Sequence, residues 1–237
     1  MPGRIPSIAP APPAPLAGGS PDWLLWQLAD SAFPTGGFAH SGGLEAAWQN
    51  GELRNRTEVQ TFLETSLAQF GRGSLPFATA AHAAPARLAE LDALCDCFTS
   101  NHVANRASRV QGQALIASAV RIFGTPELAC LRPPTAPPCA HFAPVFGVVA
   151  RALGLDRTAT ARVLLFMHLR GLIAAVVRLG VVGPLEAQGL QHRLGPVAES
   201  VLVRCQDLPV EEIAQTAPLL DLWQGTQDRL YSRLFQS

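Results

Sequence analysis

The chain has 237 residues, of which 48% are hydrophobic and only 15% are charged, and its 18 basic and 18 acidic side chains cancel. A neutral chain lacks the basic field that non-specific nucleic-acid binding needs, so no nucleic-acid partner is expected. The length is sufficient for one large hydrophobic core. Since charged residues make up about 25% of an average protein, much of this surface must be apolar or small. Two interpretations stay open: a surface covered by partner proteins, or a compact alanine-rich helical protein.

Five cysteines, an odd number without paired spacing, indicate reduced thiols and no disulfide framework (Cys95, Cys97, Cys130, Cys139 and Cys205). Cys95 and Cys97, with His102 nearby, could be imagined as ligands of nickel or zinc. Side chains two residues apart on a helix diverge by about 200°, so both cannot reach one ion without unwinding. The sequence therefore predicts no metal site and no cofactor. A nickel metallochaperone that uses these residues remains an alternative.

Two segments bear on where the chain resides. Residues 1–21 are rich in proline, alanine and glycine; they lack the continuous apolar stretch of a signal peptide and are expected to form a disordered arm. Val163–Val182 is long and apolar enough to raise the question of a membrane span. Because it contains His168, Arg170 and Arg178, each costly at the middle of a bilayer, we expect a buried core helix. The chain is predicted to be cytoplasmic, with no membrane contact.

From residue 22 onward, apolar periodicity and helix-end signals predict one helix after another. Asp22 is a plausible cap of the first helix. Thr57 and Gln60 have the spacing of a capping box before a helix that closes at Gly71. The other predicted helices span about Gly43–Asn50, Ser74–Ala84, Pro85–Phe123 with a break near Asn101, His141–Leu153, Asp156–Leu179, Pro184–Leu194, Pro196–Cys205 and Pro218–Leu230.

No segment shows the strict alternation of apolar and polar residues that is typical of a strand. The proline-rich stretch Thr125–Pro138 is a connector within one domain, because the helices on either side are too apolar to stand alone. We therefore predict an all-α fold of about eight to ten helices around one core. This single domain would span residues 22–237 and end in a docking tail over about residues 228–237.

A glycine-rich stretch, Asp30–Glu45, separates the first two predicted helices. Its four glycines and one proline favour a shaped loop that leads into a helix, with Phe38, His40, Ser41 and Glu45 near the helix start. A phosphate-binding P-loop is excluded because the chain contains no lysine. A structural turn that joins two helices remains the plain alternative.

The same loop also suggests a hydrolase that uses His40, Ser41 and Glu45. Ser41 is followed by two glycines, which is close to a nucleophile elbow, but no strand precedes it. A histidine adjacent to a serine does not by itself make a triad, and no aspartate partner can be placed. The helical hydrolase therefore stays an alternative, from a different class than a binding protein.

Other side chains suit either an interface or the core. His168 and Arg170 need partners within an apolar helix: they could line a polar cavity or an interface, or be a satisfied core histidine and an arginine that reaches outward. Aromatic residues in and around the glycine loop could be either interface anchors or part of the core, and the sequence favours neither role (Trp23, Trp26, Phe33, Phe38 and Trp48).

Three stretches resemble the urease accessory protein UreF family. Within Leu24–Glu45, the residues in register with the family signature are Pro34, Gly36, Gly37, Phe38, Ser41, Gly43, Leu44 and Glu45. His141–Gly147 resembles the helix-opening P-V-x-x-G run, and Pro218–Ser237 resembles the tail that contains L-Y-S-R-L-F. The likeness runs from about Asp22 to the last residue. His40, Thr35 and Gln236 depart from the usual pattern, and Gln236 replaces an arginine expected to help the tail dock.

The resemblance implies an all-helical homodimer that acts in urease maturation and is not an enzyme. Such proteins bridge an accessory protein, UreD (also called UreH), and the nickel-carrying GTPase UreG on apo-urease, and they are thought to couple the GTPase state to nickel delivery. By this resemblance, Glu45 is expected at the surface, in a contact that the GTPase senses. Tyr231 and Arg233 are expected to dock UreD/UreH, and Arg170 and Arg178 to serve the dimer or an internal passage. The remaining expected partner-binding residues are Phe38, His40, Ser41, Arg229 and Phe235.

Overall fold

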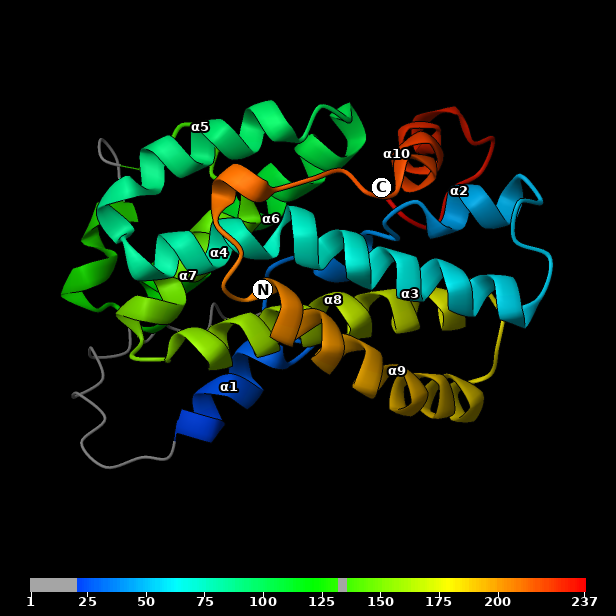
Figure 1. Cartoon of the computed structure of the whole chain (residues 1–237), viewed down its shortest axis with the longest axis horizontal. Helices are drawn as coiled ribbons and strands as arrows, with labels where there is room; N and C mark the ends of the chain where they lie inside the picture. Colours follow the sequence, from blue (N-terminus) through cyan, green and yellow to red (C-terminus); the bar gives the residue numbers. More distant parts are fainter. Residues whose placement is uncertain (1–20, 132–135) are drawn as a thin grey trace, which may run out of the picture.

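The protein is a bundle of α-helices, seen in a computed structural model that describes residues 21–131 and 136–237 (Figure 1). Its α-helices are α1 (Pro21–Ala29), α2 (Leu44–Gln49), α3 (Arg56–Gly73), α4 (Leu75–Ala83), α5 (Leu88–Phe98), α6 (His102–Ile122), α7 (Phe142–Ala152), α8 (Arg157–Arg178), α9 (Pro184–Cys205) and α10 (Pro218–Gly225). The described residues contain no strand, which confirms the all-α prediction. Apart from Pro21, where α1 begins, the predicted N-terminal arm lies outside the described residues.

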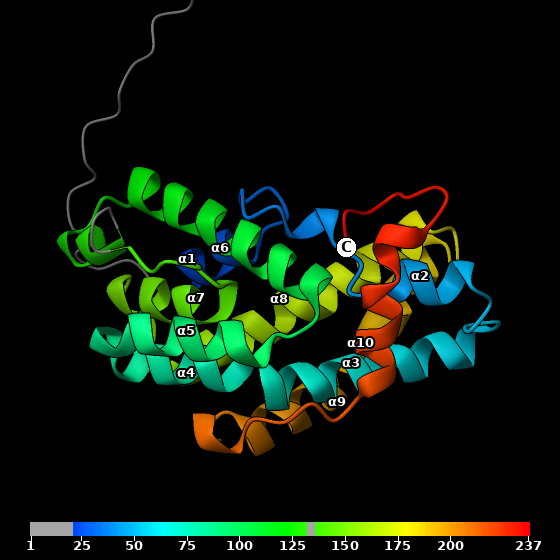
Figure 2. The ribbon, with the colours of Figure 1, turned by 90° about the horizontal axis from the view of Figure 1, so that it is seen from above.

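Two groups of helices share one core. In the first, α4 crosses α7, and α5 and α6 also pack on α7 (Figure 2). In the second, α8 packs on α9 and α3, while α1 lies against α8. A β-carbon at Gly147 of α7 would lie 2.1 Å from the carbonyl oxygen of Ala78 in α4, so glycine lets the two helix backbones touch. The close crossing of α4 and α7 depends on this residue.

Helix α8 is a core helix, as its sequence predicts. By length and composition it could cross a membrane, yet 56% of its most apolar 18-residue stretch is buried inside the protein. Its Leu164, Leu169 and Val176 are almost wholly buried. The run of apolar residues therefore serves the interior of the bundle.

The two polar residues of α8 that were predicted to need partners have them. His168 Nε2 lies 3.0 Å from Ser66 Oγ, and its ring stacks on Phe70 at 4.2 Å. Burial lowers the pKa of His168 to about 4, so the ring is neutral at pH 7. Arg170 donates to the carbonyl oxygen of Ala29, the last residue of α1. His168 is thus a satisfied core histidine, and Arg170 holds the C-terminus of α1.

Two predicted boundaries of α3 are wrong. The helix begins at Arg56, after Asn55, whose side chain accepts a hydrogen bond from Glu58 N at 3.0 Å. Asparagine is a strong N-cap, and it sets the start ahead of the predicted capping box. The helix also continues past Gly71 to Gly73. A β-carbon at Gly71 would meet the side chain of Val201 in α9 at 2.3 Å, so glycine is needed here for helix packing. Gly71 allows close packing and does not end the helix.

The structure also corrects the predicted ends of α9 and α10. Helix α9 runs unbroken through Gly195 and Pro196, although proline inside a helix costs about 3 kcal/mol. Apolar residues on both sides of the proline are buried against the core, which outweighs this cost (Ala187, Leu190, Leu194, Val201 and Leu202). Helix α10 ends at Gly225 and is followed by a short 3-10 helix, Gln227–Arg229, so the chain leaves helical geometry before the predicted end at Leu230.

Candidate functional site

The glycine loop (residues 30–45) and the tail (residues 228–237) lie side by side, although they stand at opposite ends of the sequence (Figures 1 and 2). Their backbones are joined directly: Ser41 N donates to Ser237 O at 2.5 Å, and Gln236 N donates to Ala39 O at 2.7 Å. The two most distinctive sequence motifs therefore build one structural unit.

The carboxylate of Glu45 is the centre of this unit. Its Oε1 accepts from Leu234 N at 2.7 Å and from Gln49 Nε2 at 3.1 Å. Its Oε2 accepts from Phe235 N at 3.1 Å and from Gln227 Nε2 at 2.6 Å. Glu45 is completely buried, so the expectation that it is exposed is wrong. The first turn of α2 faces the interior, and a carboxylate there is tolerated because the tail supplies its hydrogen-bond donors.

Ser41 and His40 hold the last residue of the sequence. The buried Ser41 hydroxyl donates to Ser237 O at 3.0 Å, and His40 Nδ1 lies 2.6 Å from Ser237 Oγ. Burial, followed by the nearby positive charge of Arg106, lowers the pKa of His40 to about 4. Since Ser41 and Glu45 are both engaged with the tail backbone, the arrangement gives no support to a hydrolase.

Arg178, at the end of α8, joins the loop to the tail from a second side. Its Nη1 donates to Phe38 O at 2.5 Å, and its Nη2 donates to Leu234 O at 3.0 Å. The guanidinium also lies over the ring of the buried Phe235, 4.1 Å from the ring centroid. A cation over an aromatic face contributes about 0.5–1 kcal/mol at an exposed site. Arg178 thus contacts two other predicted site residues, Phe38 and Phe235, whereas Arg170 contacts α1.

Asp228 ties the start of the tail to α6, an interaction that the sequence analysis missed. Its carboxylate accepts from Arg106 Nη2 at 2.9 and 3.1 Å and from Arg233 Nη1 at 3.0 Å, and His102 Nε2 lies at 3.4 Å. The hydrogen bond from Arg106 is the main reason why the pKa of Asp228 is lowered. Gln227, which is buried against Glu45, was missed as well. Neither residue has a local pattern that indicates a partner so distant in sequence.

Both segments of the unit expose large apolar side chains. Phe38 is 68% exposed, Leu234 is 57% exposed, and Tyr231 is fully exposed. On α10, which precedes the tail, Leu219 and Leu222 are also exposed. Arg229 and Arg233 of the tail are exposed as well, and Arg233 pairs with Asp228. Exposed apolar side chains together with arginine are typical of protein contact surfaces.

The other aromatic residues near the loop divide between core and surface. Phe33 is buried and stacks on Phe123 at 6.3 Å. Trp23 and Trp26 form an exposed edge-to-face pair on α1, with ring centroids 5.1 Å apart. Trp48 is partly buried against the core. These residues do not form one aromatic cluster with Phe38.

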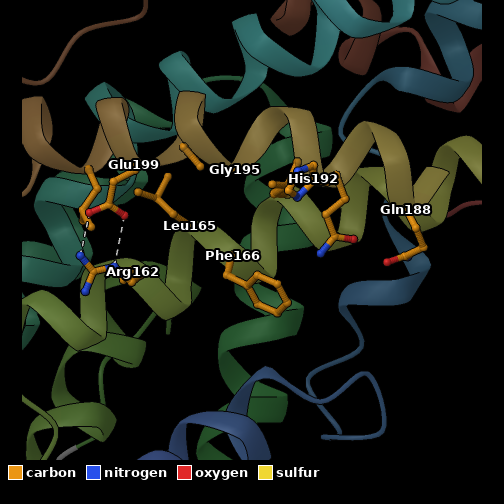
Figure 3. A pocket seen from close by; sticks show the side chains of 11 residues that line it. Arg162, Leu165, Phe166, Gln188, His192, Gly195 and Glu199 are labelled. Carbon is orange, nitrogen blue, oxygen red and sulfur yellow. Dashed lines mark hydrogen bonds and ion pairs between the residues drawn. The ribbon is translucent and has the colours of Figure 1, made fainter. Parts of the chain in front are cut away.

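A groove of about 400 Å³ lies between α8 and α9, away from the predicted site residues (Figure 3). The ion pair of Arg162 and Glu199, 2.7 Å apart, spans it, and Phe166, His192 and Gly195 line it. None of the residues predicted to bind partners borders this groove. The candidate site is therefore the loop–tail unit and not this groove.

The fold and the site define an all-α protein with a composite loop–tail surface suited to protein contact. The sequence model of the UreF family matches residues 53–195. Urease accessory protein F of rice (Oryza sativa subsp. indica) is 40% identical over 219 residues, covering 90% of this chain and 84% of its own. Urease accessory protein F of Arabidopsis thaliana is 39% identical over 221 residues, covering 91% and 92%. Urease accessory protein UreF of Arthrobacter sp. (strain FB24) is 30% identical over 223 residues, covering 93% and 99%.

The chain belongs to the UreF family of urease accessory proteins. This confirms the family resemblance of the sequence motifs. The similarity to the relatives extends beyond both ends of residues 53–195, because it covers 90% or more of the chain. Membership assigns the chain a role in urease maturation.

Proposed function

We propose that this chain is a non-catalytic adaptor of urease maturation. It bridges UreD/UreH and the GTPase UreG on apo-urease, and it couples the state of the GTPase to nickel delivery. The observation that supports this proposal is the loop–tail unit: Glu45 joins two sequence motifs into one unit, and both segments expose apolar side chains. Nickel is the cargo of this assembly, and the adaptor works in the cytoplasm as a homodimer.

The residues of the unit divide into two roles under this proposal. Phe38, Tyr231 and Arg233 are exposed and contact partners directly, together with Arg229. Glu45 is buried and acts by holding the tail in place. His40, Ser41, Phe235 and Arg178 share this second role through their contacts with the tail or the loop. UreD/UreH docks on the tail, and UreG senses whether the tail is docked.

The test is co-expression with UreD/UreH and UreG, followed by size-exclusion chromatography with light scattering. The wild-type chain should elute as a dimer within a complex that contains both partners. The double variant Tyr231→Ala/Leu234→Ala should lose UreD/UreH, since it removes exposed side chains from the tail without touching the Glu45 bonds. Leu185→Ala is the matched control, because Leu185 is an exposed leucine on α9.

Two outcomes of this experiment would contradict the proposal. If the double variant captures UreD/UreH as well as wild type does, the tail is not the docking element. If the wild-type chain ignores both partners, the adaptor proposal fails. Activation of urease in cells should follow the same order, with Leu185→Ala equal to wild type.

A further inference from the structure

A cluster of three potential metal ligands lies apart from the loop–tail unit. Asp96 comes from α5, whereas Cys139 and His141 come from the segment that leads into α7. One ligand atom from each residue, an oxygen, a sulfur and a nitrogen, lies within 4.8 Å of the other two. His141 is completely buried, and Asp96 and Cys139 are partly exposed. The cluster is therefore built on a buried imidazole and is open to solvent on one side.

The backbone that carries two of these ligands is held rigidly. The buried carboxylate of Asp92 accepts hydrogen bonds from the amides of Cys139, Ala140 and His141 at 2.9, 3.0 and 2.7 Å. Ala140 has a φ of 58°, a left-handed conformation that is unusual for a residue with a side chain. Gly112 of α6 packs directly against the carbonyl oxygen of Ala140. A buried carboxylate and an unfavourable φ at one short segment indicate preorganisation of the residues beside them.

Two further residues orient the ligand side chains. His141 Nδ1 lies 3.0 Å from Ser108 Oγ, which leaves Nε2 directed at Asp96 Oδ1, 3.1 Å away. Asn105 Nδ2 donates to the same Asp96 oxygen at 2.8 Å. Metal-bound histidines commonly use their second ring nitrogen for a hydrogen bond of this kind, which fixes the ring and the tautomer.

The charges around the cluster suit a dication. Asp92 and Asp96 carry negative charge beside Cys139, and Arg109 carries the neighbouring positive charge. With the thiolate formed, the site would hold three negative charges and one positive charge, which a divalent cation neutralises. Asp96 and Arg109 also line a surface hollow of about 490 Å³, which gives an ion access from solvent.

We propose that Asp96, Cys139 and His141 bind one divalent transition-metal ion of the zinc or nickel class. Thiolate with imidazole and carboxylate suits such borderline ions and disfavours magnesium or calcium. Metal–ligand distances of about 2.0–2.3 Å place tetrahedral ligands roughly 3.3–3.8 Å apart, so small side-chain rotations complete the site. Binding releases the Cys139 thiol proton to solvent. The proton that His141 Nε2 donates to Asp96 also leaves as the metal takes its place, and Nδ1 then carries the ring proton and donates a hydrogen bond to Ser108 Oγ. A fourth position stays open, and the proposal is independent of the proposed function.

The test uses Co²⁺ as a spectroscopic probe on the reduced, purified full chain. The wild-type chain should bind one Co²⁺ and develop the thiolate-to-cobalt charge-transfer absorption of a cysteine-ligated ion. Cys139→Ser should abolish this absorption. Cys97→Ser is the matched control: Cys97 is an exposed thiol on α5 outside the cluster, and its removal should leave the absorption unchanged. Zn²⁺ should displace the cobalt and remove the absorption.

Asp96→Asn provides a second variant that keeps a side chain of the same shape. It should weaken Co²⁺ binding by at least about tenfold, which titration measures even if Cys139→Ser does not fold. The proposal is overturned if the wild-type chain shows no charge-transfer absorption, if the absorption survives in Cys139→Ser, or if Asp96→Asn binds Co²⁺ as tightly as wild type.

Discussion

Glu45 and Asp92 use the same chemistry in two regions of the molecule. Each carboxylate is completely buried, and each accepts backbone N–H groups from a segment far along the chain. The two regions differ in the part of the protein to which the segment held by the carboxylate belongs. Residues 139–141 lead into α7, which packs on α4, α5 and α6. The tail contains no α-helix, and its side chains are mostly exposed.

This difference decides what each carboxylate does for the protein. When Asp92 is lost, the buried amides of Ala140 and His141 cannot reach water without disturbing the core, and the partly buried amide of Cys139 also loses its acceptor. When Glu45 is lost, the tail can leave the loop and hydrate its own amides. The stability lost with Glu45 therefore cannot exceed the free energy that docks the tail. The stability lost with Asp92 instead lowers the free energy of global unfolding. The first carboxylate controls a surface, and the second secures the fold.

The largest effect is expected for Asp92→Ala. Each buried N–H left without an acceptor costs about 1–3 kcal/mol, so losing the acceptor of the two buried amides should lower the free energy of unfolding by at least about 2 kcal/mol. Urea denaturation followed by circular dichroism measures it. Asp207→Ala is the control, because the Asp207 side chain is 74% exposed and its surface ion pair contributes at most about 1 kcal/mol. Equal stability of the two variants would contradict the structural role of Asp92.

Gly112→Ala should disturb the same segment, residues 139–141, because Gly112 of α6 packs against it. The new β-carbon would lie 1.8 Å from the carbonyl oxygen of Ala140, so the backbone must shift, at a cost of about 2–3 kcal/mol. Gly171→Ala in α8 is the matched control, since its β-carbon would meet nothing within 4 Å. An alanine there should raise stability by up to about 1 kcal/mol. Thermal unfolding should show shifts of opposite sign, and two shifts of the same sign would refute this packing.

Glu45→Ala should lower the free energy of unfolding less than Asp92→Ala does, by about 1–2 kcal/mol, because the tail undocks. Limited proteolysis should cleave the tail of the variant at protease concentrations that leave the wild-type tail intact. Urease activation in cells should fall together with tail docking. A loss of stability as large as that of Asp92→Ala would show that Glu45 also secures the core.

Acid should undock the tail through His40. The pKa of His40 is lowered from 6.5 to about 4 in the folded protein. Between pH 4 and pH 6.5, His40 therefore binds a proton more readily when the tail is undocked than when it is docked. Docking is therefore complete above pH 6.5 and weakens as the pH falls towards 4. Tail proteolysis by an acid-active protease across this range should show the change. His40→Asn should flatten the response, whereas His168→Gln, at a histidine that contacts Ser66 and Phe70 of α3, should leave it in place.

The smallest effect is expected for Arg178→Ala. This change removes two hydrogen bonds to carbonyl oxygens and the contact with Phe235, all at an exposed site. We expect a loss of about 0.5–1 kcal/mol in tail docking and almost none in global stability. Arg121→Ala, at an exposed position of α6, should change neither quantity. Backbone amide exchange at Leu234 and Gln236 reports the docking directly.

Local signals predicted much of the fold. The break at Asn101 and the start of α8 at Asp156 are confirmed, because both side chains cap their helices in the structure. The predicted break of α9 at Pro196 was wrong, since tertiary packing overrode a local preference.

The site was only partly predictable for a related reason. The family motifs named the right segments, but nothing local in the sequence shows that Glu45 faces inward or that its partners stand 189 and 190 residues away. The same holds for the closeness of Asp96 and Cys139, because spacing along the chain cannot reveal contacts between residues of separate segments.

The most direct test of the Glu45 clamp uses the single tyrosine of the chain, Tyr231, which lies in the tail. Incorporated 3-fluorotyrosine gives one ¹⁹F resonance whose width reports how freely the tail moves. We expect a line that is broader in the wild-type protein than in Glu45→Ala, with the helical circular dichroism unchanged. Lines of equal width in the two proteins would show that Glu45 does not hold the tail.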